Sequence, residues 1–170
     1  MDPSQGRDKD VLNALEQYSS MVYRLAYART RNRADAEDIY QEVFLRLAKS
    51  APVFTHEGHL KAWLLRVTAN CSTNLLKSAW RRRVCVVESL WEPGASAEDN
   101  QRFAALNEAL DRLPARYRAA IHLYYYEKMT VDEIAAALNV GPAAVRSRLA
   151  RGRAKLKIAL TGKEEANSDV

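Results

Sequence analysis

The stretch from Thr130 to Leu160 limits the folds open to this chain more than any other part of it. It reads TVDEIAAALNVGPAAVRSRLARGRAKLKIAL, and two segments with helical apolar spacing flank the short sequence Asn-Val-Gly-Pro. The second segment holds six Lys/Arg and no acidic residue between positions 141 and 160. Two helices joined by so tight a turn form a helix-turn-helix, and a basic second helix suits the major groove of DNA. The sequence therefore predicts double-stranded DNA as the leading partner of this segment.

Local signals favour both helices and the turn between them. Thr130 and Glu133 form the T-x-x-E pattern of a capping box at the start of the first helix. Asn139 suits the left-handed conformation that follows a helix end. Gly141 can act as the N-cap of the second helix, and Pro142 fits its first position.

The second helix has two distinct faces at 100° per residue. Val145, Leu149 and Gly152 share a narrow stripe with Leu156, and we expect this stripe to be buried. The opposite face is expected to meet the major groove, where arginine can bond guanine and serine can bond a base or a phosphate. It carries Arg146, Ser147, Ala150 and Arg151, with phosphate contacts expected from Arg148 and Arg153. The alternative is an amphipathic helix pair without a role in DNA binding.

Basic residues gather in a second segment as well. Residues 61–83 hold six Lys/Arg and no acidic residue, whereas residues 1–60 hold eight Lys/Arg and nine Asp/Glu. The formal net charge of +5 is therefore concentrated in two separate segments. One duplex contacted at two places would explain both segments, and two solvated helix faces are the alternative explanation.

Helical patterns dominate the rest of the chain, and only 6 Gly and 5 Pro in 170 residues favour helix over sheet. Apolar residues between positions 12 and 26 recur at spacings of three, four and seven, on one or two helices. Asp35 is expected to cap the next helix. The further elements expected are a helix to Leu47, a loop at 50–58, and helices at 59–83, 103–113 and 115–127. The fold class predicted is all-α.

The domain organisation follows from one break in the helical pattern. Residues 84–101 lose the helical period and contain Pro93-Gly94 followed by small and acidic residues, which indicates a flexible linker. We therefore expect two small helical domains, the second of which contains the helix-turn-helix. Their predicted bounds are 1–83 and 103–162, with a linker at 84–102 and a polar tail at 163–170.

Two further segments carry functional signals of opposite charge. The segment 35–47 has acidic and amide side chains on its outer face, which suits a basic protein surface; a solvated acidic face is the alternative. The segment 59–83 sets cations beside Trp63, Trp80 and a run of Thr, Ser and Asn, which suits stacking with unwound nucleic acid. Trp63 lies on the apolar stripe and is expected in the core, whereas Trp80 is open to a surface role.

The sequence offers little for catalysis, metal binding or membrane insertion. It has no Gly-rich phosphate loop, G-x-S-x-G or catalytic carboxylate pair, so we expect neither enzyme activity nor a cofactor. His56 and His59 lack the further ligands that would complete a metal site. No apolar run reaches the roughly 20 residues of a membrane span, and the polar N-terminus is no signal peptide. We therefore expect a cytoplasmic protein in which Cys71 and Cys85 are reduced thiols.

Three segments, in this order, resemble the extracytoplasmic-function (group IV) sigma factors of RNA polymerase. They are DAEDIYQEVFLRL at 35–47, HLKAWLLRVTANCSTNLLKSAWRRR at 59–83, and LDRLPARYRAAIHLYYYEKMTVDEIAAALNVGPAAVRSRLARGRAKL at 110–156. The resemblance covers nearly everything from Leu15 to Leu160. The order and spacing of the three motifs make it specific, which a helix-turn-helix alone would not. The short linker fits too, because this group lacks the middle sigma domain.

The resemblance implies a role for each segment, with 1–83 as sigma region 2 and 103–162 as sigma region 4. The 35–47 helix would bind core polymerase through Asp35, Asp38, Gln41, Glu42 and Phe44. The 50–83 segment would recognise and melt the −10 element, with a flipped base accepted by the loop at 50–58. The −10 residues implied are Asn70, Asn74, Lys77, Trp80, Arg81, Arg82 and Arg83. The −35 residues implied are Arg146, Ser147, Arg148, Ala150, Arg151 and Arg153.

Taken as a whole, the resemblance implies an alternative sigma factor that directs promoter-specific transcription initiation, as in a stress response. Its partners would be core RNA polymerase, through the clamp helices and the flap, and promoter DNA. Core polymerase would hold two weak DNA contacts at the right separation, so that they act as one bivalent contact. An anti-sigma factor is also implied, which would cover the same surfaces and hold the chain at the inner membrane face without membrane insertion.

Two other functions remain open on the residues alone. The main alternative is a stand-alone helix-turn-helix regulator, which would dimerise and read two half-sites. The second is a protein-interaction adaptor with a vestigial DNA domain. Neither needs both the acidic 35–47 helix and the basic 61–83 segment.

Overall fold

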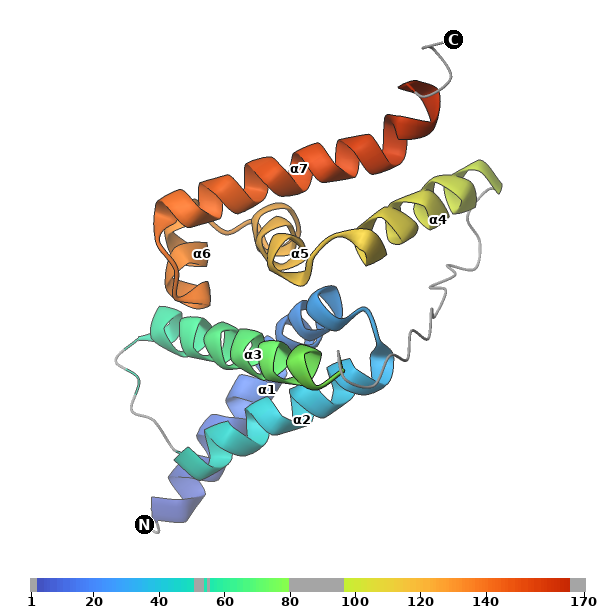
Figure 1. Cartoon of the computed structure of the whole chain (residues 1–170). Helices are drawn as coiled ribbons and strands as arrows, with labels where there is room; N and C mark the ends of the chain where they lie inside the picture. The colour runs from blue at the N-terminus through green and yellow to red at the C-terminus, as the bar shows by residue number, and fades with distance from the viewer. Residues whose placement is uncertain (1–2, 51–53, 55, 80–96, 166–170) are drawn as a thin grey trace.

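The computed structural model describes residues 3–50, 54, 56–79 and 97–165, and all regular structure among them is helical. The predicted all-α class is therefore confirmed for the described part of the chain. The helices form two bundles that follow each other in the sequence (Figure 1). The first bundle contains α1 (Pro3–Thr30), α2 (Arg33–Ser50) and α3 (Glu57–Ala79). The second contains α4 (Ala97–Arg112), α5 (Ala115–Ile121), the π-helical turn η1 (His122–Tyr126), α6 (Val131–Leu138) and α7 (Pro142–Glu165).

The first bundle is built around α1, which packs against both α2 and α3. The apolar residues between positions 12 and 26, predicted to lie on one or two helices, all lie on this single continuous helix. Val22 and Leu25 of α1, Val43 of α2 and Leu64 and Leu65 of α3 are fully buried. Burying such aliphatic side chains is worth about 1.5–3 kcal/mol each, so these three helices form one cooperative core.

The turn between α1 and α2 corrects one prediction. The helix begins at Arg33, and the backbone N–H of Asp35 donates to Oδ1 of Asn32 over 3.0 Å. Asn32 is therefore the residue whose side chain caps α2, and Asp35 lies in the first turn instead. The cap lies three residues upstream of the predicted one because Asn, like Asp, has a side-chain oxygen that accepts from a helix N–H. In the first turn, the negative charge of Asp35 still interacts favourably with the helix dipole.

The segment expected to be a linker is partly helical. Helix α4 begins at Ala97, so residues 97–102 of the predicted linker belong to a helix. No Gly or Pro interrupts the sequence from Ala97 to Arg112, so the helical pattern that is regular from Phe103 extends further upstream. Helix α7 runs to Glu165, so residues 163–165 of the predicted 163–170 tail are helical. The remaining predicted linker, 84–96, lies outside the described residues, as do positions 166–170 of the tail and the last four positions of the predicted 59–83 helix.

The predicted 115–127 helix changes type halfway. Helix α5 ends at Ile121, and the next five residues, His122–Tyr126, form a π-helical turn. Such wider turns inside helices are rare and are frequent at functional sites. Here the turn leaves Tyr124, Tyr125 and Tyr126 exposed while Leu123 is fully buried.

The helix-turn-helix is formed by α6 and α7, as the sequence predicts. The Thr130 hydroxyl accepts from the N–H of Glu133 over 3.2 Å, which is the expected cap of α6. Asn139 ends α6 in the left-handed conformation, with φ 56° and ψ 47°. Helix α7 then begins at Pro142, the position at which a missing N–H does no harm.

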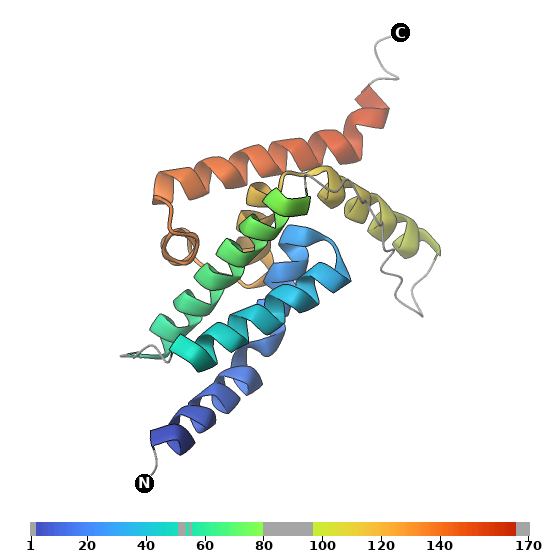
Figure 2. The ribbon, with the colours of Figure 1, turned by 60° about the horizontal axis from the view of Figure 1, so that its bottom comes forward.

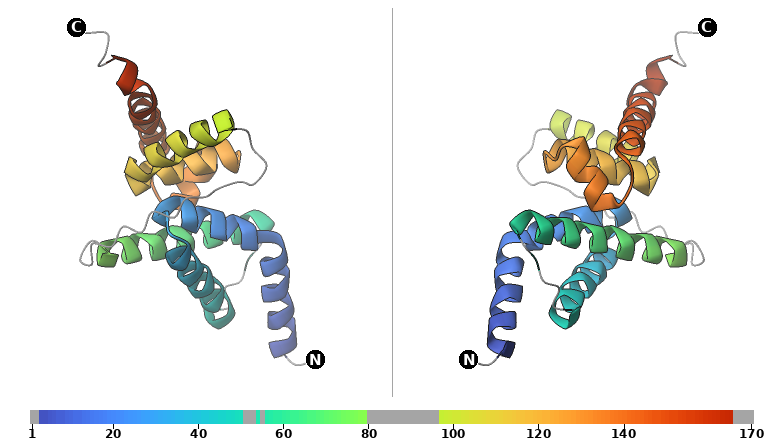
Figure 3. Two further views of the ribbon diagram at one scale, coloured as in Figure 1. Left: turned by 90° about the vertical axis from the view of Figure 1, so that its right-hand side faces the viewer. Right: turned by 90° about the vertical axis from the view of Figure 1, so that its left-hand side faces the viewer.

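The two bundles lie directly against each other. Helix α5 packs on α1 and α6 packs on α3, while α7 runs along the far side of α5 and α6 (Figures 1 and 2). The start of α1 and the end of α7 lie at opposite ends of the molecule (Figure 3). Buried apolar residues of both bundles belong to one continuous cluster. The two domains that the sequence predicts to be separated by a linker therefore pack against each other in this structure.

Candidate functional site

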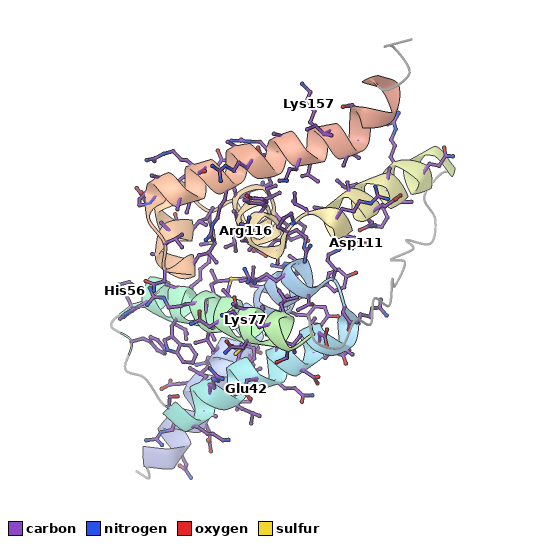
Figure 4. All side chains as sticks on the ribbon, viewed as in Figure 1. Glu42, His56, Lys77, Asp111, Arg116 and Lys157 are labelled. Carbon is purple, nitrogen blue, oxygen red and sulfur yellow. The ribbon has the colours of Figure 1, made fainter. Side chains whose placement is uncertain are left out.

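Helix α7 has a buried side and an exposed basic side, divided as its periodicity predicts. Val145 is fully buried, Leu149 is 2% exposed, and Gly152 is buried. The opposite side is open to solvent over two turns, and the predicted base-facing residues on it are Arg146, Ser147, Ala150 and Arg151. Figure 4 shows Lys157, further along α7, pointing away from the rest of the molecule. The exposed side therefore carries positively charged side chains on successive turns of the helix.

Gly152 sets how closely α7 lies on α5. A Cβ atom at this position would lie 2.6 Å from Cδ1 of Ile121 and 3.3 Å from Cβ of Tyr117. A glycine here leaves room for the side chains of Ile121 and Tyr117 to pack against the backbone of α7. The orientation of the exposed basic side thus depends on a glycine on the buried side.

Three of the six residues predicted for the −35 element interact with side chains outside α7. Hydrogen bonds from Arg116 and Arg151 lower the pKa of the Tyr117 hydroxyl of α5. Arg153 is exposed, and it donates to the hydroxyl of Tyr125 over 2.8 Å. Arg148 is half-buried and lies close enough to Arg29 of α1 to lower the pKa of that guanidinium. The reason is helical geometry, because position 148 lies about 60° from Val145 and so at the edge of the buried stripe.

Helix α3 carries the exposed polar side predicted for the −10 element. Asn70, Asn74 and Lys77 are exposed. The hydroxyl groups of Thr68 and Ser72, on the other side of α3, are fully buried and donate to carbonyls one turn back, over 2.6 and 2.7 Å. Trp80 and Arg81–Arg83 lie outside the described residues. Trp63, expected in the core, is half-buried, and its ring meets that of Phe54 edge-on at 5.9 Å.

Helix α2 presents an acidic surface. Asp38, Gln41 and Glu42 are exposed, and Glu42 pairs with Arg46 one turn later over 2.7 Å. Leu45 lies on the same side at the i+7 position from Asp38 and is 52% exposed. Leu45 was not predicted for this surface, although its seven-residue spacing from Asp38 is visible in the sequence. This side of α2 therefore combines an exposed apolar side chain with negative charge.

Phe44 and Asp35 are placed differently from the rest of this predicted set. Phe44 is 7% exposed, and its ring packs on Tyr40 with 5.0 Å between centroids. It belongs to the core, where it supports α2 rather than its exposed surface. Asp35 is half-buried, and burial raises the pKa of its carboxyl, with the negative charge of Asp38 adding to the effect.

A cleft joins the predicted polymerase-binding and −10 residues. It has a volume of about 680 Å³ and lies between α2 and α3, and Asp38, Glu42 and Asn74 are among the residues that line it. The acidic side of α2 and the polar side of α3 therefore meet across one groove. His56 and His59 do not form a metal site: Nδ1 of His56 accepts from the backbone N–H of His59 over 3.1 Å. No group of three metal-binding side chains exists among the described residues.

His122 is a buried titratable group where η1 meets α1. Its ring stacks on Tyr126 with 5.2 Å between centroids, and its Nε2 lies 3.4 Å from a carboxylate oxygen of Glu127. Burial lowers the pKa of His122 and outweighs the opposing effect of Glu127, while Arg24 of α1 lowers it further. Neutral imidazole is therefore the favoured form in the folded protein.

This shift predicts an acid-sensitive stability. Because the folded pKa lies below the ordinary value of about 6.5, the unfolded chain takes up the proton first as the pH falls. We expect the free energy of unfolding to decrease as the pH falls below about 6.5 and through the folded pKa. Denaturant unfolding at a series of pH values measures the decrease. In His122→Phe, which keeps a ring on Tyr126 but cannot titrate, the decrease should be smaller, and an equal decrease would contradict the prediction.

Comparisons with known proteins identify the two helical bundles that carry these surfaces. The family model for Sigma-70 region 2 matches residues 14–82, and the model for Sigma-70, region 4 matches residues 103–156. The ECF RNA polymerase sigma factor SigE of Mycolicibacterium smegmatis is 34% identical over 151 residues, which are 84% of this chain and 58% of that protein. The chain belongs to the ECF sigma factors. RNA polymerase sigma factor SigV of Bacillus subtilis is 28% identical over 89% of this chain and 91% of its own length.

Solved structures of sigma factors share the fold of this ECF sigma factor. The sigma factor RpoE of Bartonella quintana, solved in complex with the anti-sigma factor NepR, matches 90% of this chain and 98% of its own. The TM-score is 0.73 at 22% identity. CnrH, solved in complex with the cytosolic domain of CnrY, matches with a TM-score of 0.66 over 98% of this chain, at 21% identity. Both matches include the two bundles.

In this sigma factor, region 2 therefore corresponds to α1–α3, and region 4 begins within α4 and ends within α7. The exposed side of α7 belongs to region 4, and the acidic side of α2 and the polar side of α3 belong to region 2. None of the helices in the described part of the chain has the length and apolar character required to cross a membrane.

Proposed function

We propose that this ECF sigma factor binds core RNA polymerase and directs promoter-specific initiation, reading a −35 element with α7 and a −10 element with α3. The observation that carries the proposal is the presence, in one chain, of an exposed cationic side on a region 4 helix and an exposed acidic side on a region 2 helix. DNA attracts the first and repels the second, so the second is suited to a protein partner.

The residue assignments follow from exposure. Base contacts to the −35 element come from Arg146, Ser147 and Arg151, with Ala150 packing against a base and Arg153 contacting phosphate. Asn70, Asn74 and Lys77 contact the −10 strand. Asp38, Gln41, Glu42 and Leu45 bind the clamp helices of the polymerase, and region 4 binds the flap. The protein acts as an initiation factor without enzyme activity, and without a cofactor.

The regulation proposed is restraint by an anti-sigma factor in the cytoplasm. The similar sigma factors RpoE and CnrH were solved with the anti-sigma factor NepR and with the cytosolic domain of CnrY, and we extend that kind of partner to this chain. A membrane-bound anti-sigma factor would keep the protein at the inner membrane face. No observation favours the stand-alone regulator, because a dimeric reader of two half-sites has no use for region 2.

Reconstituted transcription tests the proposal. Core polymerase with the full chain should initiate from a subset of a promoter library that core polymerase alone leaves silent. Asp38→Ala should reduce the affinity for core polymerase without changing which promoters are chosen. Glu37→Ala is the matched control, since this exposed acidic residue lies about 100° away on the same helix. Failure of the chain to bind core polymerase would overturn the sigma assignment.

A further inference from the structure

A cleft of about 500 Å³ lies between the last turns of α1 and the second bundle. Figure 1 shows where these elements meet, with the end of α1 just below α5 in that view. Apolar and aromatic side chains form most of its lining, among them Tyr23 and Tyr27 of α1, Phe103 of α4 and Ile121 of α5. Small-molecule sites are concave, mostly apolar clefts of about 300–1,000 Å³, and they are frequent at the junction of two domains.

The charged side chains among the described residues that line this cleft are all arginines. They are Arg24 of α1, Arg31 just after it, Arg33 at the start of α2, and Arg118 of α5. Glu127 pairs with the first of these over 2.9 Å and Asp111 with the second over 2.7 Å, but neither carboxylate lines the cleft. A bound molecule would therefore meet a positive surface, which suits an anion.

Arg118 is a buried cation that forms no ion pair with a carboxylate among the described residues. It is 8% exposed, and it donates to four carbonyl oxygens at the ends of α1 and α4, those of Ala28, Arg29, Leu110 and Leu113. Burial lowers the pKa of Arg118 to about 10, and the positive charge of Arg31 adds to the effect while Asp111 opposes it. Because carbonyl groups carry only partial negative charge, an anion in the cleft would supply a counter-charge that the chain itself lacks there.

Flat groups form walls on both sides of the cleft. The guanidinium of Arg31 lies over the ring of Tyr27, 5.2 Å from its centroid. On the other side, the guanidinium of Arg24 lies 5.2 Å from the centroid of Tyr126, whose ring stacks on His122 with 12° between the planes. Rings and guanidinium planes bind flat aromatic molecules through stacking and cation–π contacts. The cleft therefore suits an aromatic ligand better than an aliphatic one.

Two departures from regular helix geometry border the cleft. The π-helical turn η1 supplies His122, Tyr125 and Tyr126 to its lining. Arg31 has a φ of 53°, a left-handed conformation that residues other than glycine rarely adopt. Wider helical turns and strained residues are both frequent at functional sites. These two observations concern the backbone, so they support a binding site independently of the charge of the lining.

The volume of the cleft favours a small molecule over a protein segment. Three turns of an α-helix about 10 Å in diameter are roughly 16 Å long and fill roughly 1,300 Å³. The cleft offers about 500 Å³, so a helix would have to displace one of the bundles to enter it. A molecule of two or three rings fits without such a displacement.

We propose that this cleft binds a planar aromatic anion, with Arg24 and Arg31 at the anionic group and the rings of Tyr27 and Tyr126 against the faces of the ligand. The proposal goes beyond promoter recognition, because it adds a small-molecule site to the chain. None of the residues assigned to the polymerase, the −10 element or the −35 element lines the cleft. Binding can therefore be measured on the free chain, and its failure would leave the proposed function untouched.

Two dyes that differ in a single group test the site on the full-length chain. Anilinonaphthalene sulfonate is an aromatic anion whose fluorescence rises in an apolar site, and phenylnaphthylamine is the same ring system without the sulfonate. We expect the sulfonate to bind once per chain and at least about tenfold more tightly than the neutral dye. No saturable binding of the sulfonate, or equal affinities for the two dyes, would overturn the proposal.

Ala28→Leu tests the place of binding. Ala28 lines the cleft, and leucine there fills part of it without removing a native side-chain contact. The affinity for the sulfonate should fall at least about tenfold. Ala48→Leu is the matched control, since Ala48 is exposed on α2 and lines neither this cleft nor the one between α2 and α3; it should keep the wild-type affinity. Equal affinities in the two variants would show that the dye binds elsewhere and would overturn the site.

Arg24→Gln tests the role of charge. Glutamine keeps a side chain that can bond Glu127, but it carries no positive charge. The affinity for the sulfonate should fall several-fold while that for phenylnaphthylamine stays the same. A general loss of structure, which circular dichroism detects, would lower both affinities together and leave their ratio unchanged. An unchanged ratio in the folded variant would overturn the anionic class of ligand. The two dyes on the wild-type chain decide the proposal even where a variant fails to fold.

Discussion

Arg146→Ala is expected to reduce discrimination between the preferred −35 element and a single-base variant of it by about 1–3 kcal/mol, or roughly 5- to 150-fold. Arg146 is exposed on the side of α7 that faces away from α5 and α6, where a bidentate contact to guanine is geometrically available. Removing it takes away a contact that depends on base identity. Transcription by the reconstituted holoenzyme from paired promoters, wild type and −35 variant, measures the ratio.

Lys157→Ala is the matched control for this experiment. Lys157 is exposed on the same helix but lies three turns further along, beyond the first turns that enter the groove in helix-turn-helix proteins. Its loss should weaken binding to all promoters equally or leave it unchanged, and should lower the salt dependence. Unchanged promoter choice in Arg146→Ala would show that the side of α7 assigned to the groove is wrong.

Gly152→Val is expected to lower the free energy of unfolding of region 4 by about 2–3 kcal/mol through overpacking. Even a Cβ atom would lie 2.6 Å from Ile121, and valine adds two methyl groups to it. Relieving the clash requires either that the Ile121 side chain leave its position or that α7 move off α5, and the second response also tilts the exposed basic side. Denaturant unfolding followed by circular dichroism measures the loss, and −35 discrimination should weaken in the same variant.

Gly6→Val controls for the exchange of glycine for valine in a helix. Gly6 lies in α1 with no atom within 4 Å of a Cβ placed there, so only the small difference in helix propensity applies. Its free energy of unfolding should change by less than about 0.5 kcal/mol. If Gly152→Val were no less stable than Gly6→Val, then α5 and α7 would not depend on their close approach.

Local features of this chain were predictable because their causes lie within a few residues. The cap at Thr130, the left-handed Asn139 and the start of α7 at Pro142 each depend on one side chain and its nearest backbone. One local error, Asp35 in place of Asn32, arose because two capping residues stand three positions apart and a pattern alone does not choose between them. Likewise, the π-helical turn after Ile121 has no signal in the apolar spacing.

The candidate surfaces were predicted in part. Exposure of Arg146, Ser147 and Arg151 followed from helical periodicity, and so did the buried stripe opposite them. Phe44 was assigned to a surface through the family motif, although its place on the apolar stripe of α2 already indicated the core. Leu45 was overlooked because a single exposed leucine is common and carries no meaning without its neighbours on the same side.

The sequence by itself determined the helices, the helix-turn-helix, its basic side and membership of the ECF sigma factors. These depend on periodicity, caps and motifs, which repeat over short distances along the chain. The tertiary structure alone decided that region 4 closes on region 2, and that Arg118 lies on the carbonyl ends of α1 and α4. It also decided that Arg148 of α7 lies near the buried Arg29 of α1. The sequence does not distinguish a buried arginine from a solvated one, because the difference depends on packing between residues that lie far apart in the chain.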